Sequence, residues 1–179
     1  MSKPFEPEVA AVAKRVETKL VEKLNSLFKR LRAEKGPGRE CDNIILLLDG
    51  EVAAFLEIEV VSLSRWKRIK TKYPTVRWPI SKKETCGEKE EKEGKPVFMA
   101  SVPKDLSDIF VIDARTWISE GHEEEAPAVV SRLGGTPRVH RYRKRSGEKF
   151  WAIGKERVKW GFEGLEDYIL SKLGLVKQL

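Results

Sequence analysis

The sequence predicts a mixed α/β fold in which a central mixed sheet is flanked by helices, and three observations lead to this class. One amphipathic helical pattern lies near the N-terminus, several apolar runs of strand length follow it, and a second amphipathic helical pattern lies near the C-terminus. A chain of 179 residues with 40% hydrophobic residues is about one domain long and can bury a core. We therefore expect residues 1–179 to form a single domain, with a core over about 7–115 and a C-terminal extension over about 116–179.

The first pattern predicts one long helix over Pro7–Ala33. Its apolar residues recur at steps of three and four, which places them on one face. These residues are Val9, Val12, Val16, Leu20, Leu24, Leu27 and Leu31. Pro7 is tolerated in a first helical turn, and the Gly36-Pro37-Gly38 sequence is typical of a helix end.

The next segment predicts two strands joined by a tight turn. Asn43–Leu48 is a continuous apolar run, Asp49-Gly50 is a strong turn signal, and Glu51–Val61 follows as the second strand. Strand alternation divides that second strand into two faces. Ala54, Leu56, Ile58 and Val60 form one face, and Phe55, Glu57, Glu59 and Val61 form the other.

Farther along the chain, residues 85–95 (TCGEKEEKEGK) are polar and lack periodicity, which favours a solvated loop. Strands are expected over Val97–Val102 and Ile109–Asp113. A loop and a short helix are expected over residues 122–135, and a β-hairpin centred on Ser146-Gly147-Glu148 is expected in the C-terminal extension. The second amphipathic helix carries Leu165, Tyr168, Ile169 and Leu173 on one face.

The charge balance favours an anionic partner. Charged residues make up 35% of the chain, against ~25% in typical soluble domains, and 35 Lys and Arg against 28 Asp and Glu leave a net charge of +7. The alternative interpretation is a thermophile-like surface rich in Lys and Glu.

The cysteines and the apolar runs bear on the compartment. Cys41 and Cys86 lie far apart without CxxC spacing, so we expect two reduced thiols and neither a zinc motif nor a disulfide. The N-terminus resembles no signal peptide, and no run reaches the ~20 apolar residues of a membrane span. These features predict a cytoplasmic protein without a membrane partner.

Three carboxylates form the candidate catalytic group. Asp42 precedes the first strand of the expected hairpin, and Glu57 and Glu59 share one face of its partner. Like charges side by side repel, and a bound cation relieves that repulsion. Mg²⁺ prefers oxygen ligands and can activate water against a phosphodiester. The alternative is an ordinary polar strand face, solvated or paired with lysines.

These residues resemble the PD-(D/E)xK nuclease superfamily, which includes type II restriction enzymes and Holliday junction resolvases. The resemblance covers roughly residues 7–115 and rests on Asp42 in CDNIILLL, on Glu57-Ile58-Glu59 in FLEIEVV and on the later strand in LSDIFVID. It implies a restriction-endonuclease-like core and a Mg²⁺ site, with Mn²⁺ as a substitute, that has Asp42 and Glu57 as ligands.

This sequence departs from the family pattern at two positions. Cys41 stands where the motif has Pro, and Glu59 stands where the motif commonly has Lys. The resemblance implies that Glu59 acts as a general base or an extra ligand, and that Lys67 or Lys70 could supply the missing positive charge. Many members also place a Glu on the first helix near the metal, and Glu17 is our candidate, against the alternative of a solvated helix charge.

Two basic segments are candidates for nucleic-acid binding. The first contains Arg65, Lys67, Arg68, Lys70, Lys72 and Arg77, and the second contains Arg141, Arg143, Lys144 and Arg145. Trp66, Tyr73 and Trp78 are interleaved with the first segment, where they could stack on bases, although core packing is the commoner role of Trp.

The sequence therefore favours a Mg²⁺-dependent endonuclease that acts on DNA, of the restriction, repair or junction-cleaving type. The first alternative is a non-catalytic nucleic-acid-binding protein on a degenerate nuclease fold, and the second is a structural or partner-binding protein. The sequence is also compatible with a homodimer. With only His122 and His140 in the chain, a His-rich catalytic site is excluded.

Overall fold

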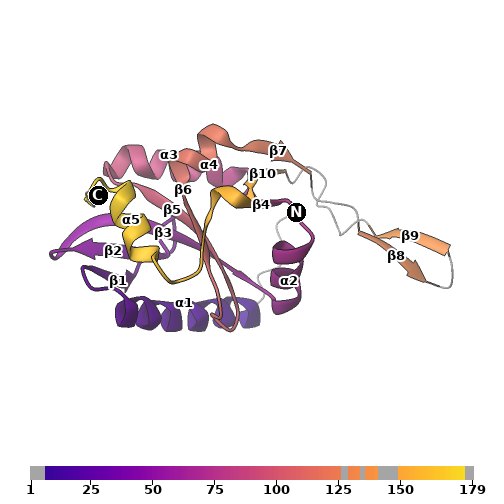
Figure 1. Cartoon of the computed structure of the whole chain (residues 1–179), viewed down its shortest axis with the longest axis horizontal. Helices are drawn as coiled ribbons and strands as arrows, with labels where there is room; N and C mark the ends of the chain where they lie inside the picture. The colour runs from indigo at the N-terminus through magenta and orange to yellow at the C-terminus, as the bar shows by residue number, and fades with distance from the viewer. Residues whose placement is uncertain (1–6, 126–128, 134–135, 141–148, 176–179) are drawn as a thin grey trace.

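A computed structural model describes residues 7–125, 129–133, 136–140 and 149–175 of the chain. Six strands form a central sheet in the order β1 (Leu31–Lys35), β2 (Ile44–Leu48), β3 (Glu51–Val61), β5 (Val97–Pro103), β6 (Phe110–Asp113) and β11 (Lys159–Trp160). Only β3 and β5 pair in parallel; the other neighbours are antiparallel. This mixed sheet with helices on both faces confirms the predicted α/β class (Figure 1).

The central sheet separates two apolar core layers, and helices cover each of them. On one face, α1 (Pro7–Leu27) and α5 (Leu165–Lys172) pack on the apolar cluster that contains Leu56 and Ile58. On the other, α2 (Leu63–Thr71), α3 (Ser81–Glu93) and α4 (Ala114–Glu120) cover the cluster that contains Phe55 and Val61. The two faces predicted for β3 are therefore confirmed.

A smaller antiparallel sheet lies on the second face, in the order β4 (Thr75–Pro79), β10 (Phe150–Gly154) and β7 (His122–Glu124). A 3-10 turn, η1 (Lys155–Arg157), leads from β10 to β11. Two further strands, β8 (Val129–Leu133) and β9 (Thr136–His140), pair with each other. Among the described residues, the fold contains no helix with the length and apolar character that a bilayer crossing demands.

The β2–β3 hairpin forms as predicted. Asp49 and Gly50 both have positive φ, 52° and 81°, as a two-residue turn between right-twisted strands requires. The β2–β3 pairing runs only from Leu48–Glu51 to Ile44–Leu56, so the second half of β3 extends beyond the start of β2. That extension carries Glu57 and Glu59.

The predicted first helix is wrong in its last part, because Leu31–Lys35 is the edge strand β1. Leu31 and Ala33 are buried while Arg32 and Glu34 are exposed, a period of two. The Glu166 carboxylate, from α5, accepts the backbone N–H groups of residues 29–31 at 2.9–3.1 Å. A distant side chain thus satisfies the donors of the segment that leaves the helix.

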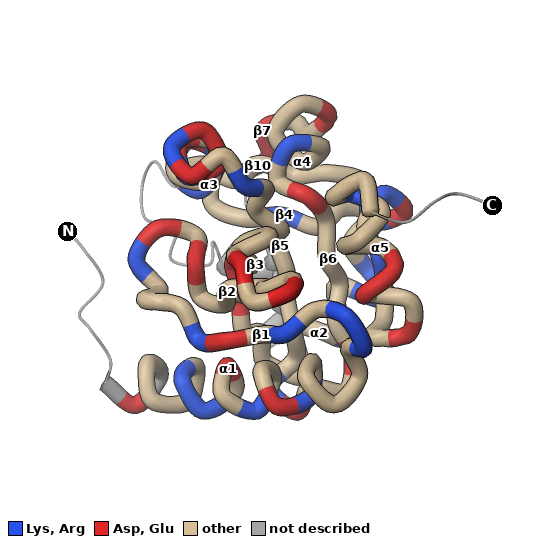
Figure 2. Tube along the Cα trace, turned by 90° about the vertical axis from the view of Figure 1, so that its left-hand side faces the viewer, with Lys and Arg blue, Asp and Glu red and all other residues tan. Residues whose placement is uncertain are grey.

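The solvated loop predicted over residues 85–95 is also wrong, since most of it belongs to α3. Lys and Glu are good helix formers, and they alternate around this helix (Figure 2). Only Cys86 and Lys89 are buried, so the helix has no apolar stripe to reveal it. Gly94 ends it at φ 64°.

Two predictions for the C-terminal extension are corrected. Residues 122–135 contain β7 and β8 where a loop and a short helix were expected, and the helix α4 precedes them. The hairpin predicted around residues 146–148 does not pair β9 with β10: β9 pairs with β8, and β10 pairs with β4 and β7. The expected turn itself lies outside the described residues. The C-terminal helix α5 is confirmed.

Candidate active site

Asp42, two residues before β2, is buried, and both of its carboxylate oxygens have partners. Its Oδ1 accepts the backbone N–H groups of Arg39 and Glu40 at 2.9 and 3.2 Å, and its Oδ2 lies 3.3 Å from Lys89 Nζ of α3. Burial alone would raise the pKa of this carboxyl, but these hydrogen bonds and the Lys89 charge hold the pKa below its usual range. Asp42 is therefore a charged, oriented group at neutral pH.

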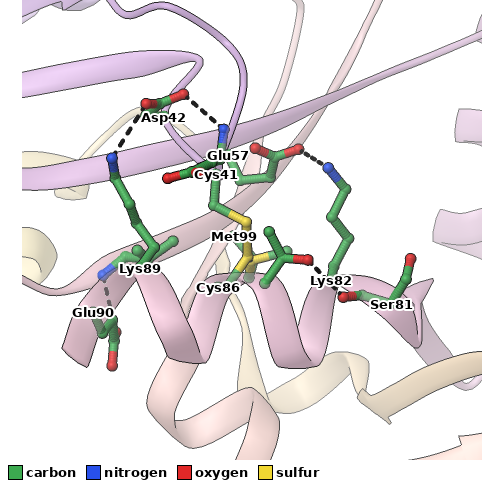
Figure 3. The surroundings of a disulfide bond; sticks show 12 residues. Cys41, Asp42, Glu57, Ser81, Lys82, Cys86, Lys89, Glu90 and Met99 are labelled. Carbon is green, nitrogen blue, oxygen red and sulfur yellow. Dashed lines mark hydrogen bonds and ion pairs between the residues drawn. A yellow bond between two sulfur atoms is a disulfide. The ribbon is translucent and has the colours of Figure 1, made fainter. Parts of the chain in front are cut away.

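Glu57 lies on β3 beside a second lysine of α3. Its Oε1 is 2.7 Å from Lys82 Nζ, and the Glu57 side chain is only 11% exposed. Lys82 and Lys89 are seven residues apart, about two helical turns, so both ammonium groups reach the sheet from one face of α3. Figure 3 shows Lys89 directed to Asp42 and Lys82 directed to Glu57.

A disulfide between Cys41 and Cys86 lies between these two ion pairs (Figure 3), so the prediction of two free thiols is wrong. Cys86 follows Lys82 by one helical turn, and Cys41 immediately precedes Asp42. The two Cα atoms are 5.6 Å apart across a sequence separation of 45. Spacing in the sequence could not reveal this pair, because tertiary packing alone brings α3 beside the β1–β2 loop. Disulfides persist in oxidising compartments and in the cytosol of hyperthermophiles.

We expect the Cys41→Ala/Cys86→Ala double variant to lose about 2–4 kcal/mol of unfolding free energy, because the cross-link restricts the unfolded chain. Urea denaturation of oxidised wild type and of the variant measures the difference. Reduced wild-type protein should resemble the variant. An unchanged unfolding midpoint in both would contradict a structural role for the cross-link.

Glu59 shares a face of β3 with Glu57, as predicted, but has different neighbours. Its Oε1 lies 3.6 Å from Arg65 Nη2, and Ser101 is its partner in the register with β5. Burial raises the pKa of Glu59, and the charges of Arg65 and Arg77 offset part of that increase. The three carboxylates thus face three separate cations. Within the described ranges, no three His, Cys, Asp or Glu side chains form a group that could hold a metal ion, so Asp42, Glu57 and Glu59 do not form one cluster.

Glu17 of α1 belongs to the same region. Its Oε1 accepts Asn43 Nδ2 at 3.3 Å, while Asn43 Oδ1 accepts the backbone N–H of Ile58 at 2.9 Å. Burial raises the pKa of Glu17, with a further increase from the negative charge of Glu57. The Asn43 side chain therefore adds one hydrogen bond to β3 beyond the last backbone pair of β2 and β3. It also links Glu17 to the backbone of Ile58, between Glu57 and Glu59. The sequence motifs did not single out Asn43.

The lysines expected to replace the motif lysine are located elsewhere. Lys67 is exposed on α2, and Lys70 Nζ pairs with Asp108 Oδ2 at 2.8 Å. Instead, Lys82 of α3 provides the ammonium group beside Glu57. No local pattern connects it to Glu57, 25 residues earlier in the chain.

The first basic segment is partly engaged within the fold. Arg65 pairs with Glu59, Arg77 pairs with Glu124 at 3.5 Å, and Lys72 is exposed. Arg68 is half-buried. Trp66 and Trp78 are buried, which confirms core packing over base stacking for both. The second cluster of Arg141, Arg143, Lys144 and Arg145 lies outside the described residues.

No family model matches this chain, and no curated protein matches it. Among solved structures, it is similar to a Holliday junction resolvase of Archaeoglobus fulgidus, an archaeal hyperthermophile. The identity is 13%, the match covers 92% of this chain and 98% of that chain, and the TM-score is 0.45. At this identity and TM-score, the similarity concerns only the approximate path of the backbone and says nothing about the chemistry of the site.

Proposed function

We propose that this chain is a metal-dependent nuclease that cleaves DNA, with Asp42 and Glu57 as the metal-binding carboxylates and Lys82 in the role of the motif lysine. The observation that carries the proposal is the 2.7 Å pairing of Lys82 Nζ with Glu57 Oε1. The ExE sequence lacks a lysine on β3, and α3 supplies an ammonium group beside the first glutamate. The order of α1 and the first three strands also resembles the PD-(D/E)xK core.

The donor set suits Mg²⁺ better than a transition metal. Asp42 and Glu57 offer hard carboxylate oxygens, and Mg²⁺ commonly binds through one or two carboxylates, waters and substrate phosphates. A two-carboxylate site therefore suffices without Glu59. When bound, such an ion polarises a phosphodiester and lowers the pKa of its water.

The residues of the chain have distinct roles in this proposal. A DNA phosphate would compete with Glu57 for the Lys82 ammonium, so that Glu57 could hold the cation, and Lys82 would neutralise the charge that develops on the phosphate. Asn43 would fix the Glu57–Ile58 peptide by accepting the Ile58 N–H group, and Glu17 would hold Asn43 in place. Lys89 keeps the Asp42 carboxylate ionised and oriented.

The second candidate is a non-catalytic DNA-binding protein on a degenerate nuclease fold. It is favoured by the separate neutralisation of Asp42, Glu57 and Glu59 by Lys89, Lys82 and Arg65. Incubation of supercoiled, linear and branched DNA with the protein, with and without Mg²⁺ or Mn²⁺, separates the two. Metal-dependent nicking or linearisation is expected; binding without any cleavage would favour the second candidate.

DNA affinity should fall steeply with salt, because exposed basic residues such as Lys67 and Lys72 would neutralise phosphates. Each neutralised phosphate adds roughly 0.9 to the slope of log K against log salt. A fluorescence-anisotropy titration over a range of salt concentrations measures the slope. Lys67→Ala should reduce the slope by roughly 0.9, the contribution of one phosphate contact. A wild-type affinity that does not change with salt would favour a thermophile-like surface without a nucleic-acid partner.

A further inference from the structure

A recess of about 120 Å³ opens beside Glu59, between β3, α2 and β4. Its polar end contains Glu59 and Arg65, together with Arg77 and Glu124 of the smaller sheet. Its walls include Ile69, Tyr73 and Phe110, which are largely apolar. Neither the two metal-binding carboxylates nor Lys82 lines it.

The lining suits a nucleobase better than a phosphate. The two carboxylates and the two guanidinium groups pair with each other, Glu59 with Arg65 and Glu124 with Arg77, so the polar end has no net positive charge to attract a phosphate. The combination of carboxylate acceptors and guanidinium donors instead matches the edge of a base. Tyr73 is half-buried and offers a ring on which a base could stack. Arg77 is held among Glu124, Tyr73 and Phe150, with its Cζ 4.7 Å from the Phe150 ring centroid, so its donors are already oriented.

The position of the recess relates it to the proposed cleavage site. Glu59 follows Glu57 by two residues on β3, about 6.6 Å along the strand. One nucleotide of an unstacked strand spans a similar length. A phosphate at Glu57 and Lys82 would therefore leave a neighbouring base within reach of the recess.

We propose that this recess is a base-binding pocket that accepts one unstacked nucleobase next to the phosphate held at Glu57, with Tyr73 as the stacking wall and Glu59 as the acceptor for base N–H groups. This inference rests on the proposed function for its position relative to the cleaved bond. Base binding itself is separable from cleavage, because it can be measured without a catalytic metal.

The test compares binding of an oligothymidylate with binding of an abasic deoxyribose-phosphate strand of the same length, in Ca²⁺ at low salt. Wild type should prefer the base-containing strand by roughly 5- to 150-fold, the range that stacking of one base supplies. Tyr73→Ala should remove this preference and Tyr73→Phe should retain it. Lys72→Ala, an exposed phosphate-contact control, should weaken both strands equally.

Glu59→Gln replaces an acceptor with a mixed donor and acceptor, so it should change the ranking of the four homopolymers. Equal binding of the two probes by wild type would overturn the pocket, and an unchanged ranking in Glu59→Gln would overturn the assignment of Glu59. A protein that prefers bases but never cleaves DNA would retain the pocket and lose the nuclease proposal.

Discussion

Glu57→Gln should reduce Mg²⁺-dependent DNA cleavage by several decades while DNA affinity is retained or rises. The substitution keeps the shape of the side chain, but it removes the charged oxygen that pairs with Lys82 and that we propose as a metal ligand. Loss of a metal ligand removes much of the several-kcal/mol stabilisation that a metal gives the transition state, and each 1.36 kcal/mol is tenfold in rate. Loss of a negative charge reduces repulsion of phosphate. Initial rates of plasmid nicking and anisotropy titrations measure the two effects.

Glu51→Gln is the matched control, because Glu51 begins the same strand and is exposed. It should cleave at the wild-type rate. If Glu57→Gln cleaves equally well, the active site is elsewhere. If wild type cleaves nothing with Mg²⁺ or Mn²⁺, the non-catalytic alternative replaces the proposal.

Asp42→Asn should lower the free energy of unfolding by about 3–5 kcal/mol, because it leaves the buried Lys89 ammonium without its Asp42 partner. The two side chains are 6% and 8% exposed, so water compensates little of the loss. Lys89 keeps an ion pair with Glu93, which is 39% exposed, at 3.5 Å, and a contact with the Phe55 ring, whose centroid is 4.6 Å from Nζ. Urea denaturation at neutral pH measures the change.

The double variant Asp42→Asn/Lys89→Met should recover most of that loss, since it removes both members of the pair and keeps an apolar stem on α3. Lys92→Met, which breaks the exposed pair of Lys92 with Glu40, should change stability by less than about 1 kcal/mol. A double variant as unstable as Asp42→Asn would mean that Asp42 acts through its hydrogen bonds to residues 39 and 40 and not through Lys89.

The stability that Asp42 contributes should decrease at acid pH. Its folded pKa lies below the unfolded value of 3.8, so the folded state binds the proton more weakly. The contribution is complete above the unfolded pKa and is lost as pH falls through the folded pKa. The stability difference between wild type and Asp42→Asn should therefore narrow in acid.

Local sequence information predicted the strands that carry the candidate site. The alternation in Glu51–Val61 assigned Glu57 and Glu59 to one face correctly, and the Asp-Gly pair located the turn between β2 and β3. Both features depend on neighbouring residues and on backbone preferences. By contrast, the sequence could not show which residue provides the ammonium group that the motif lysine would supply at the position of Glu59. Lys82 lies beside Glu57 only because α3 packs on the sheet.

The sequence by itself determined the α/β class, the β2–β3 hairpin, the two faces of β3 and the C-terminal helix, because periodicity and turn chemistry act over a few residues. Tertiary structure alone decided where the helical pattern gives way to β1, since Glu166 captures the backbone donors there. It also decided that a polar, aperiodic segment becomes α3, and that this helix brings Lys82, Cys86 and Lys89 beside Glu57, Cys41 and Asp42. Contacts between residues so distant in the chain depend on how the elements pack, which no local pattern encodes.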